Sequence, residues 1–504
     1  MKQPSLCVLL LALCLAALAS TTARADVARF DTAEIVLHAS RTYDGTRGLP
    51  NPFVDVDLTA DAVSPGGRRY RVDGFFDGDG KGGAVGDIFK IRIPAEEPGT
   101  WRWTVRSNDP GLAGRSGSFL CAGKLAGPFS AGPVEVNPRY PRSFRYRLGE
   151  PVYLLGKFLD NPAPDPLKWT HVFFSEALTD ADRRAMLDRQ LAMKANKLNI
   201  YIANLGDYKG TWPTTPWLGT AAANDKTRFD LERWHRWERQ LLDLRGRGVA
   251  AHLWFFADDS RFGALSDADR MRLIRFGMAR LSSYVNTLFT LVLEWEEGWT
   301  ADEVERHMTY LQRKNPWDRL ATVHGQIGDF DFPQAPWADF LDLQVEAGSH
   351  RNVYAAGIAN RALAAKPVLQ EEMGQGYENG ETRAKGWAAF MAGAGGAGGG
   401  AFLAPLATFI ARVPFHRMEP MNRLVLSGSA YALAEPGKAY AFYLPDNRSN
   451  GKITVDLSAA SGTLVVEWLD PRTGAWLAGP PVRGGGPVTL RSPQNGDWAL
   501  YIHP

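Results

Sequence analysis

The 504-residue sequence predicts an α/β protein in which a (β/α)8 barrel is flanked by two β-sandwiches. Short strands separated by turn residues fill residues 26–122 and 425–504, without any helical period. Between them, residues 132–420 alternate strands with amphipathic helices over a length typical of such a barrel. The hydrophobic share of 45% indicates a globular chain with a large core, long enough for several domains.

The N-terminus predicts a secretory leader at residues 1–25. Lys2 precedes an apolar run from Leu6 to Ala19, and Ala23-Arg24-Ala25 forms a cleavage site. The run is too short to span a membrane, so we expect a secreted or periplasmic protein. Cleavage would leave Cys121 without a cysteine partner and bring the formal net charge from +2 to zero. Such a balance does not favour binding to nucleic acid or to an anionic membrane.

The first sandwich rests on alternating strands. They are expected at residues 34–38, 53–58, 87–93 and 100–105. Within this region the loop from Asp73 to Gly80 resembles a calcium loop. Position twelve counted from Asp77 is Ile88, where a calcium loop needs a glutamate. A polar turn is the favoured interpretation, and a cation site is the alternative.

The barrel is predicted from about eight strand-helix repeats. Its strands are expected at residues 152–156, 198–203, 249–256, near 291, 320–324, 340–345, 366–370 and 401–403. Its helices are expected at residues 180–194, 231–244, 267–284, 301–312 and 383–391. The glycine-rich run at 392–400 indicates close backbone packing around the last strand. The final sandwich has expected strands at residues 440–444, 452–457, 462–468, 488–491 and 498–502.

Two of the predicted barrel strands end in paired glutamates. LVLEWEEGWT (291–300) carries Glu294, Glu296 and Glu297, and KPVLQEEMG (366–374) carries Glu371 and Glu372. A barrel places its chemistry at the C-terminal ends of its strands, and two facing carboxylates are what glycoside hydrolysis needs. Each pair alone would more often be a solvated loop, but two pairs at strand ends favour catalysis.

Strand alternation gives Glu297 one parity and both Glu294 and Glu296 the other. The parity by itself leaves open which of them faces the barrel axis.

The order of motifs resembles a family of secreted glycoside-hydrolase-like proteins. Its members have an N-terminal Ig-like domain of unknown function, an apiosidase-like (β/α)8 barrel and a C-terminal domain labelled collagen-binding. The matching motifs are Gly74-Phe-Phe-Asp-Gly-Asp79, Pro98-Gly-Thr-Trp101, Asn204-Leu-Gly-Asp207, Glu296-Glu297, Asn315-Pro-Trp-Asp318, Glu371-Glu-Met-Gly374, Tyr431-Ala-Leu-Ala-Glu-Pro-Gly437 and Trp468-Leu-Asp-Pro-Arg-Thr-Gly474.

The resemblance implies a retaining mechanism with Glu372 as the nucleophile and Glu297 as the acid/base. The chain departs from the family at Ala257-Asp258-Asp259-Ser260 and at Trp295 and Gly298, which flank the glutamate pair. These departures concern mainly the substrate.

Further rim residues are expected to bind sugar. They are Asn204, Asp207, Trp212, Asp258, Asp259, Trp295, Glu296, His324, Glu371 and Arg383. Helix capping is an equal alternative for Asn204 and Asp207, and a structural histidine is one for His324. Trp217, Trp254 and Trp299 could stack on sugar rings, with core packing as the alternative for Trp254.

No metal or cofactor is expected, since the histidines lack metal-ligand spacing. The predicted function is hydrolysis of a plant or microbial polysaccharide or oligosaccharide. The alternative is a non-catalytic carbohydrate or matrix binder that has lost turnover.

Overall fold

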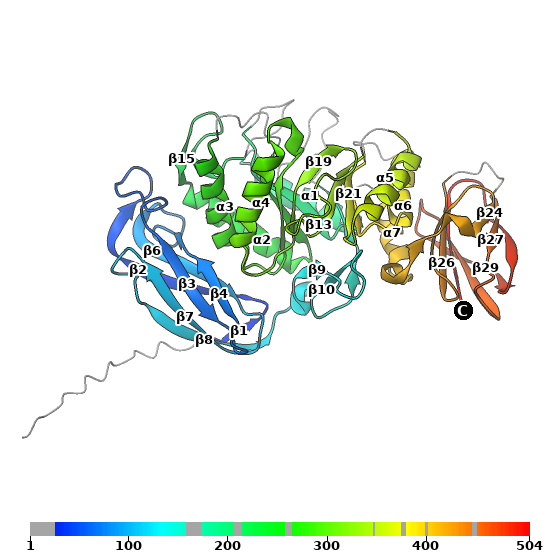
Figure 1. Cartoon of the computed structure of the whole chain (residues 1–504), viewed down its shortest axis with the longest axis horizontal. Coiled ribbons are helices and arrows are strands. Elements are labelled where there is room, and N and C mark those ends of the chain that lie inside the picture. Colours follow the sequence, from blue (N-terminus) through cyan, green and yellow to red (C-terminus); the bar gives the residue numbers. More distant parts are fainter. Residues whose placement is uncertain are drawn as a thin grey trace, which may run out of the picture.

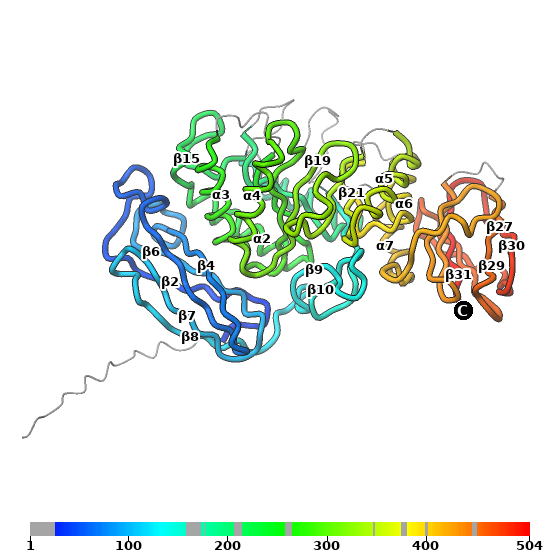
Figure 2. The backbone as a smooth tube through the Cα atoms, viewed as in Figure 1, coloured from blue at the N-terminus to red at the C-terminus, as the bar shows by residue number. Residues whose placement is uncertain are grey.

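The computed structural model describes residues 26–157, 173–176, 178–205, 214–257, 265–345, 348–373, 380–398, 402–445 and 451–504. Three regions follow one another along the molecule: an N-terminal β region (26–124), an α/β region (154–410) and a C-terminal β region (419–503) (Figure 1). A connecting segment (128–152) joins the first two and lies along the lower edge of the α/β region in Figure 2. The predicted leader and the candidate residues Asp207, Trp212, Asp258 and Asp259 lie outside the described residues.

The N-terminal β region contains two sheets. One has the order β1 (Asp26–Arg29), β8 (Ser116–Lys124), β7 (Gly99–Ser107), β3 (Leu58–Val63), β4 (Arg69–Asp73), and the other β2 (Thr32–Asp44), β6 (Val85–Pro94), β5 (Phe75–Phe76). Buried and half-buried residues alternate along β3, which gives the sheet one core face. Cys121, on β8, is buried and free.

The expected strand at residues 53–58 is wrong for all but its last residue. Residues 53–55 lie in a turn, in which the carbonyl of Asn51 accepts hydrogen bonds from the backbone N–H groups of Val54 and Asp55. The Phe53 ring packs 5.3 Å from Phe76 and 5.7 Å from Phe276, between ring centroids. Phe53 therefore packs against the core from a turn, and no strand is needed to place it there.

The loop from Asp73 to Gly80 joins two regions. Asp77 is fully buried and its carboxylate lies 2.8 Å from Lys90 Nζ, 2.9 Å from His235 Nε2 and 2.8 Å from Arg280 Nη1. Asp79 accepts hydrogen bonds from the backbone N–H groups of Lys81 and Gly83. The loop is thus a polar turn whose central carboxylate contacts Lys90 of its own region and His235 and Arg280 of the α/β region.

The α/β region is built on parallel strands. They are β12 (Leu154–Leu155), β13 (Lys197–Ala203), β16 (Ala250–Phe256), β17 (Thr287–Val292), β18 (Ala321–Thr322), β19 (His324–Ile327), β20 (Leu341–Gln344), β21 (Val368–Glu372) and β22 (Gly396–Ala397). Their sheets have the orders β13-β16-β17-β18 and β12-β22-β21-β20-β19. The two sheets adjoin where Val323 alone separates β18 from β19, and where Asn196 N–H donates to the carbonyl of Leu155 at 2.9 Å.

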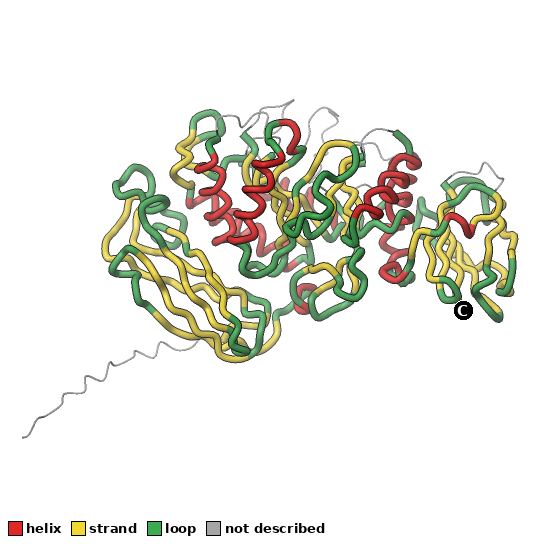
Figure 3. Tube along the Cα trace, in the orientation of Figure 1, coloured by secondary structure: helices red, strands yellow, loops and turns green. Residues whose placement is uncertain are grey.

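Helices cover this sheet (Figure 3). They are α1 (Asp180–Ala192), α2 (Leu231–Gly246), α3 (Asp267–Leu281), α4 (Ala301–Arg313), α5 (His350–Leu363), α6 (Gly380–Met391) and α7 (Leu403–Ile410). Side chains of Thr179, Asp230, Ser266, Thr300 and Ser349 cap the first five. The sequence did not predict α5 or α7. A short antiparallel pair, β14 (Trp217–Gly219) and β15 (Asn224–Phe229), precedes α2.

The connecting segment forms an antiparallel sheet of β9 (Val134–Val136), β10 (Phe144–Tyr146) and β11 (Pro151–Val152). The C-terminal β region has one sheet in the order β23 (Glu419–Pro420), β25 (Tyr431–Glu435), β26 (Ala439–Leu444), β31 (Trp498–His503), β28 (Thr463–Leu469), β29 (Trp476–Arg483), and another in the order β24 (Val425–Ser427), β27 (Lys452–Asp456), β30 (Pro487–Arg491).

The regions pack against one another. One continuous cluster of buried apolar side chains includes Ile91 of β6, Trp234 of α2, Trp387 of α6 and Tyr443 of β26. At the first junction, Arg92 donates to both carboxylate oxygens of Glu238 at 2.7 and 2.9 Å. In the described part of the chain, no helix is long and apolar enough to cross a membrane.

Candidate active site

The chain turns sharply after β17. The strand ends at Val292, and Glu294 takes a left-handed backbone conformation (φ 43°, ψ 57°) before a 3-10 turn over Trp295–Glu297. A non-glycine residue in this conformation is uncommon and occurs often at functional sites. Because the strand has ended, its alternation does not extend to the glutamates, so the parity argument does not apply to them.

Glu294 is half-buried and lies among other carboxylates. Burial raises its pKa to about 8, and the negative charge of Glu372 and contact with Glu297 act in the same direction. The side chain of Gln344 hydrogen-bonds Glu294, and Gln344 lies opposite Glu372 in the register of β20 and β21. The ends of β17, β20 and β21 therefore bring Glu294 and Glu372 together.

Glu296 and Glu297 lie on the exposed side of the same turn. Glu296 accepts from the backbone N–H of Gln326 at 2.9 and 3.0 Å, and Glu297 accepts from Gln326 Nε2 at 3.2 Å. Trp295 is partly buried and donates from Nε1 to Asp331 at 3.2 Å. These contacts hold the turn against β19 and the segment that follows it.

Glu371 has a different environment from its neighbour Glu372. Its side chain is fully buried, receives a hydrogen bond from Lys197 Nζ at 2.7 Å and also hydrogen-bonds Asn199. Burial alone would raise its pKa, but Lys197 and His252 outweigh it and lower the pKa to about 2. A substrate cannot reach this carboxylate, so Glu371 anchors β21 inside the protein, whereas Glu372 is only partly buried at its end.

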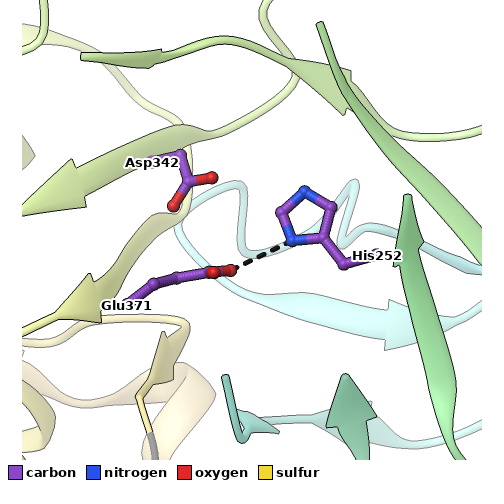
Figure 4. A group of neighbouring side chains, drawn as sticks. All are labelled: His252, Asp342 and Glu371. Atoms are coloured by element: carbon purple, nitrogen blue, oxygen red, sulfur yellow. Dashed lines mark hydrogen bonds and ion pairs between the residues drawn. The ribbon is translucent and has the colours of Figure 1, made fainter. Parts of the chain in front are cut away.

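Three buried polar side chains, His252, Asp342 and Glu371, lie close together (Figure 4). His252 Nδ1 lies 3.0 Å from Glu371 Oε1 and Nε2 lies 2.7 Å from Thr290 Oγ1. A carboxylate only accepts, so Nδ1 carries the proton and Nε2 accepts from the hydroxyl. Burial, together with the charge of Glu371, raises the pKa of Asp342 well above its ordinary value.

His252, Asp342 and Glu371 have donor atoms within 4.8 Å of one another. This set does not suit a metal ion. Both His252 nitrogens already hydrogen-bond, and the Lys197 ammonium already binds Glu371. The cluster is an internal ion network.

The other predicted rim residues lie in different environments. His324 is fully buried 5.1 Å from the Trp254 ring, burial lowers its pKa to about 3, and neither ring nitrogen has a hydrogen-bond partner among the described residues. Asn204 is buried and its backbone pairs with Thr214. Arg383 donates to both oxygens of Asp497 in the C-terminal β region, at 2.8 and 3.0 Å.

The predicted stacking tryptophans are core residues in the described part of the chain. Trp217 and Trp254 are 0% exposed and Trp299 is 4% exposed. Sequence reasoning missed Lys197, Asn199, His252, Asp342 and Gln344. The one signal that could have found them is a polar residue inside an otherwise apolar strand, as in Lys197 and Asn199 of β13.

Comparison with known proteins gives a family match for the N-terminal region alone. Residues 26–108 match the model described as a domain of unknown function, DUF5060. A search of curated proteins gives no match.

Solved structures resemble most of the chain. A protein from Bacteroides vulgatus ATCC 8482 named as a candidate glycoside hydrolase is 19% identical, with a TM-score of 0.75, over 95% of this chain and 99% of that one. A glycoside hydrolase family 5 protein from the same organism is 14% identical, with a TM-score of 0.61, over 75% of this chain and 95% of that one. The chain therefore has a mixed α/β fold shared with glycoside hydrolases.

Proposed function

We propose that this protein is a retaining glycoside hydrolase that cleaves a plant or microbial polysaccharide or oligosaccharide. The proposal includes a (β/α)8 barrel at residues 132–420, an Ig-like sandwich at 26–122, a small sandwich at 425–504 and export directed by residues 1–25. The parallel strand series and the fold shared with glycoside hydrolases support the barrel.

One observation carries the chemistry: Glu294 and Glu372 share a single electrostatic site at the C-terminal ends of parallel strands. Retaining hydrolysis needs one carboxyl that is protonated at working pH and one that is ionised. The two environments differ as this requires. Glu294 has a raised pKa, and Glu372 is the neighbouring negative charge that helps to raise it.

We assign Glu372 as the nucleophile, as the sequence motif implies, and Glu294 as the acid/base. The motif resemblance favoured Glu297 for the second role. Glu297 is exposed, whereas Glu294 is half-buried and its pKa responds to the charge of Glu372. Glu297 instead contacts Glu294 and helps keep it protonated, because two adjacent carboxylates resist double ionisation.

The test uses Glu372→Gln, Glu294→Gln, Glu297→Gln and Glu296→Gln on a polysaccharide panel and on aryl glycosides with good leaving groups. Glu372→Gln should lose turnover of every substrate. Glu294→Gln should lose about 10²- to 10⁴-fold with poor leaving groups and keep the activated ones, which need no proton. Glu297→Gln and Glu296→Gln should act mainly on the pH profile.

The acid would be Glu297 if Glu297→Gln lost turnover of substrates with poor leaving groups while Glu294→Gln kept it. Binding without sugar release by the parent protein, across the whole panel, would refute the hydrolase and leave the carbohydrate binder.

A further inference from the structure

We propose that a cavity on the opposite side of the α/β region binds a small anion, either a free oxyanion or the acidic group of one sugar unit. The cavity has a volume of about 230 Å³, and its lining includes Arg139, Arg142, Arg361, Phe415, Arg417 and Glu419. This volume lies below the roughly 300–1,000 Å³ of sites for drug-sized ligands and suits a small one.

The cavity is far from the glutamates along the strands. Gly393 and Ala394, which line it, come just before β22, and Arg361 lies at the end of α5, which leads into β21. The cavity therefore lies at the N-terminal ends of the parallel strands. Glu294 and Glu372 lie at the opposite, C-terminal ends, Glu294 after β17 and Glu372 as the last residue of β21. The inference is therefore independent of the proposed hydrolysis.

The charges of the cavity are unbalanced. Arg361 is buried and donates to Glu419 Oε2 at 2.6 Å and to the carbonyl of Gly393 at 2.9 Å. Arg417 is paired with Glu435 at 3.1 Å. Arg139 and Arg142 have no carboxylate partner among the described residues, so their two positive charges face a cavity whose carboxylates are already engaged.

Arg142 is half-buried in the wall of the cavity. Its Nε is shielded from solvent and has no hydrogen-bond partner in the described part of the chain. Its charge also acts on the buried Arg361 and, with burial, lowers the pKa of that guanidinium. Two neighbouring guanidinium groups repel each other, and an anion bound in the cavity would reduce that repulsion.

The loop that carries Arg139 and Arg142 has fixed geometry. The backbone of Asn137 donates to the carbonyl of Ser143 at 2.9 Å, and Ser143 Oγ donates to the carbonyl of Tyr140 at 2.9 Å. The Tyr140 ring packs edge-on against His416, between centroids 5.0 Å apart. The backbone that carries the two arginines is thus held in place, which lowers part of the entropy cost of binding.

Three segments meet at this cavity: the connecting segment, the α/β region and the start of the C-terminal β region. An anion bound there would link them. Binding should therefore raise the melting temperature of the whole protein, because a ligand that binds only the folded state stabilises it.

The experiment measures melting temperature and calorimetric binding of the full mature chain with sodium sulfate, sodium phosphate and sodium glucuronate, against sodium chloride at equal ionic strength. We expect a saturable rise with at least one of the three. Stronger binding of glucuronate identifies an acidic sugar, and stronger binding of sulfate or phosphate identifies a free oxyanion.

Arg142→Gln should weaken that binding about tenfold or more, since it removes charge-assisted hydrogen bonds. Arg142→Lys keeps the charge, and its affinity for the anion should lie between those of Arg142→Gln and the parent. Arg102→Gln, an exposed arginine of β7, is the matched control and should behave as the parent. No saturable response to any of the three anions, or equal binding by Arg142→Gln and the parent, would overturn the proposal.

Discussion

Lys197 Nζ and Glu371 Oε1 form an ion pair of 2.7 Å, and neither side chain is exposed to solvent. Lys197 starts β13 and Glu371 stands next to the end of β21, so the pair ties together two strands that are distant in sequence. It also fixes the strand that presents Glu372. The stability of the protein should depend on this pair more than on any exposed salt bridge of similar length.

Lys197→Met should destabilise the fold by about 3–5 kcal/mol, because it leaves a buried carboxylate without its main partner. The double variant Lys197→Met/Glu371→Gln should recover part of the loss, since the neutral amide needs no counter-charge. Denaturant unfolding measures both. A double variant no more stable than the single one would contradict this account.

The same carboxylate predicts acid sensitivity. The folded pKa of Glu371 is about 2, below the ordinary value of about 4.3, so its contribution to stability is present above about pH 4. That contribution is lost as the pH falls toward 2. Unfolding midpoints measured from pH 6 to pH 2 should fall less steeply for Lys197→Met/Glu371→Gln than for the parent.

The proposed acid predicts an alkaline limit to catalysis. The pKa of Glu294 is raised to about 8, so the carboxyl is protonated below that pH and ionises above it. Sugar release from substrates with poor leaving groups should therefore decline as the pH rises through about 8. Glu297→Gln removes one source of the shift and should move this limb to lower pH. If the alkaline decline of the Glu297→Gln variant stayed at the pH of the parent, Glu297 would not contribute to the raised pKa of Glu294.

Arg280 should hold the N-terminal β region in place. It donates to Glu238 at 2.6 Å and to Asp77 at 2.8 Å, and it is fully buried. Arg280→Met should cost about 3 kcal/mol, whereas Arg69→Met, at an exposed position of β4, should change stability by less than about 0.5 kcal/mol. Small-angle scattering should fit one rigid shape for the parent and a broader distribution for Arg280→Met. Flexible scattering from the parent would refute the docking.

Gly396 should be intolerant of a side chain. A Cβ there would lie 2.6 Å from the carbonyl oxygen of Leu154 and would also clash with Leu369 on β21. Gly396→Ala should cost about 1–3 kcal/mol through overpacking. Gly486→Ala, which meets nothing within 4 Å, is the matched control and should be nearly neutral in denaturant unfolding.

The sequence predicted the elements whose pattern is local. The apolar runs of β16 and β21 and the capped helices α2, α3 and α4 were found within a few residues of their bounds, whereas β17 was expected near residue 291 and begins at Thr287. Helix α5 was missed because its alanines and glycine give little contrast between its faces. Strand β29 was missed because most of its residues are exposed and it holds two prolines.

The candidate site was predictable only to the level of which strands end in carboxylates. The burial of Glu371 depends on Lys197, Asn199 and His252, which β13 and β16 supply, and no local pattern links them to β21. The role of Glu294 depends on a left-handed turn after β17. A prediction that extends the alternation of the strand beyond Val292 misses that turn.

Arg383, in the helix that follows Glu372, forms its paired hydrogen bonds with Asp497 of the C-terminal β region, and Tyr443 donates to the same carboxylate at 2.9 Å. The α/β region and the C-terminal β region therefore cannot be exchanged independently of each other. A recombinant that keeps this α/β region but receives another C-terminal module would inherit an arginine matched to a carboxylate it no longer has. Shuffling such modules would succeed only where both sides of that contact travel together.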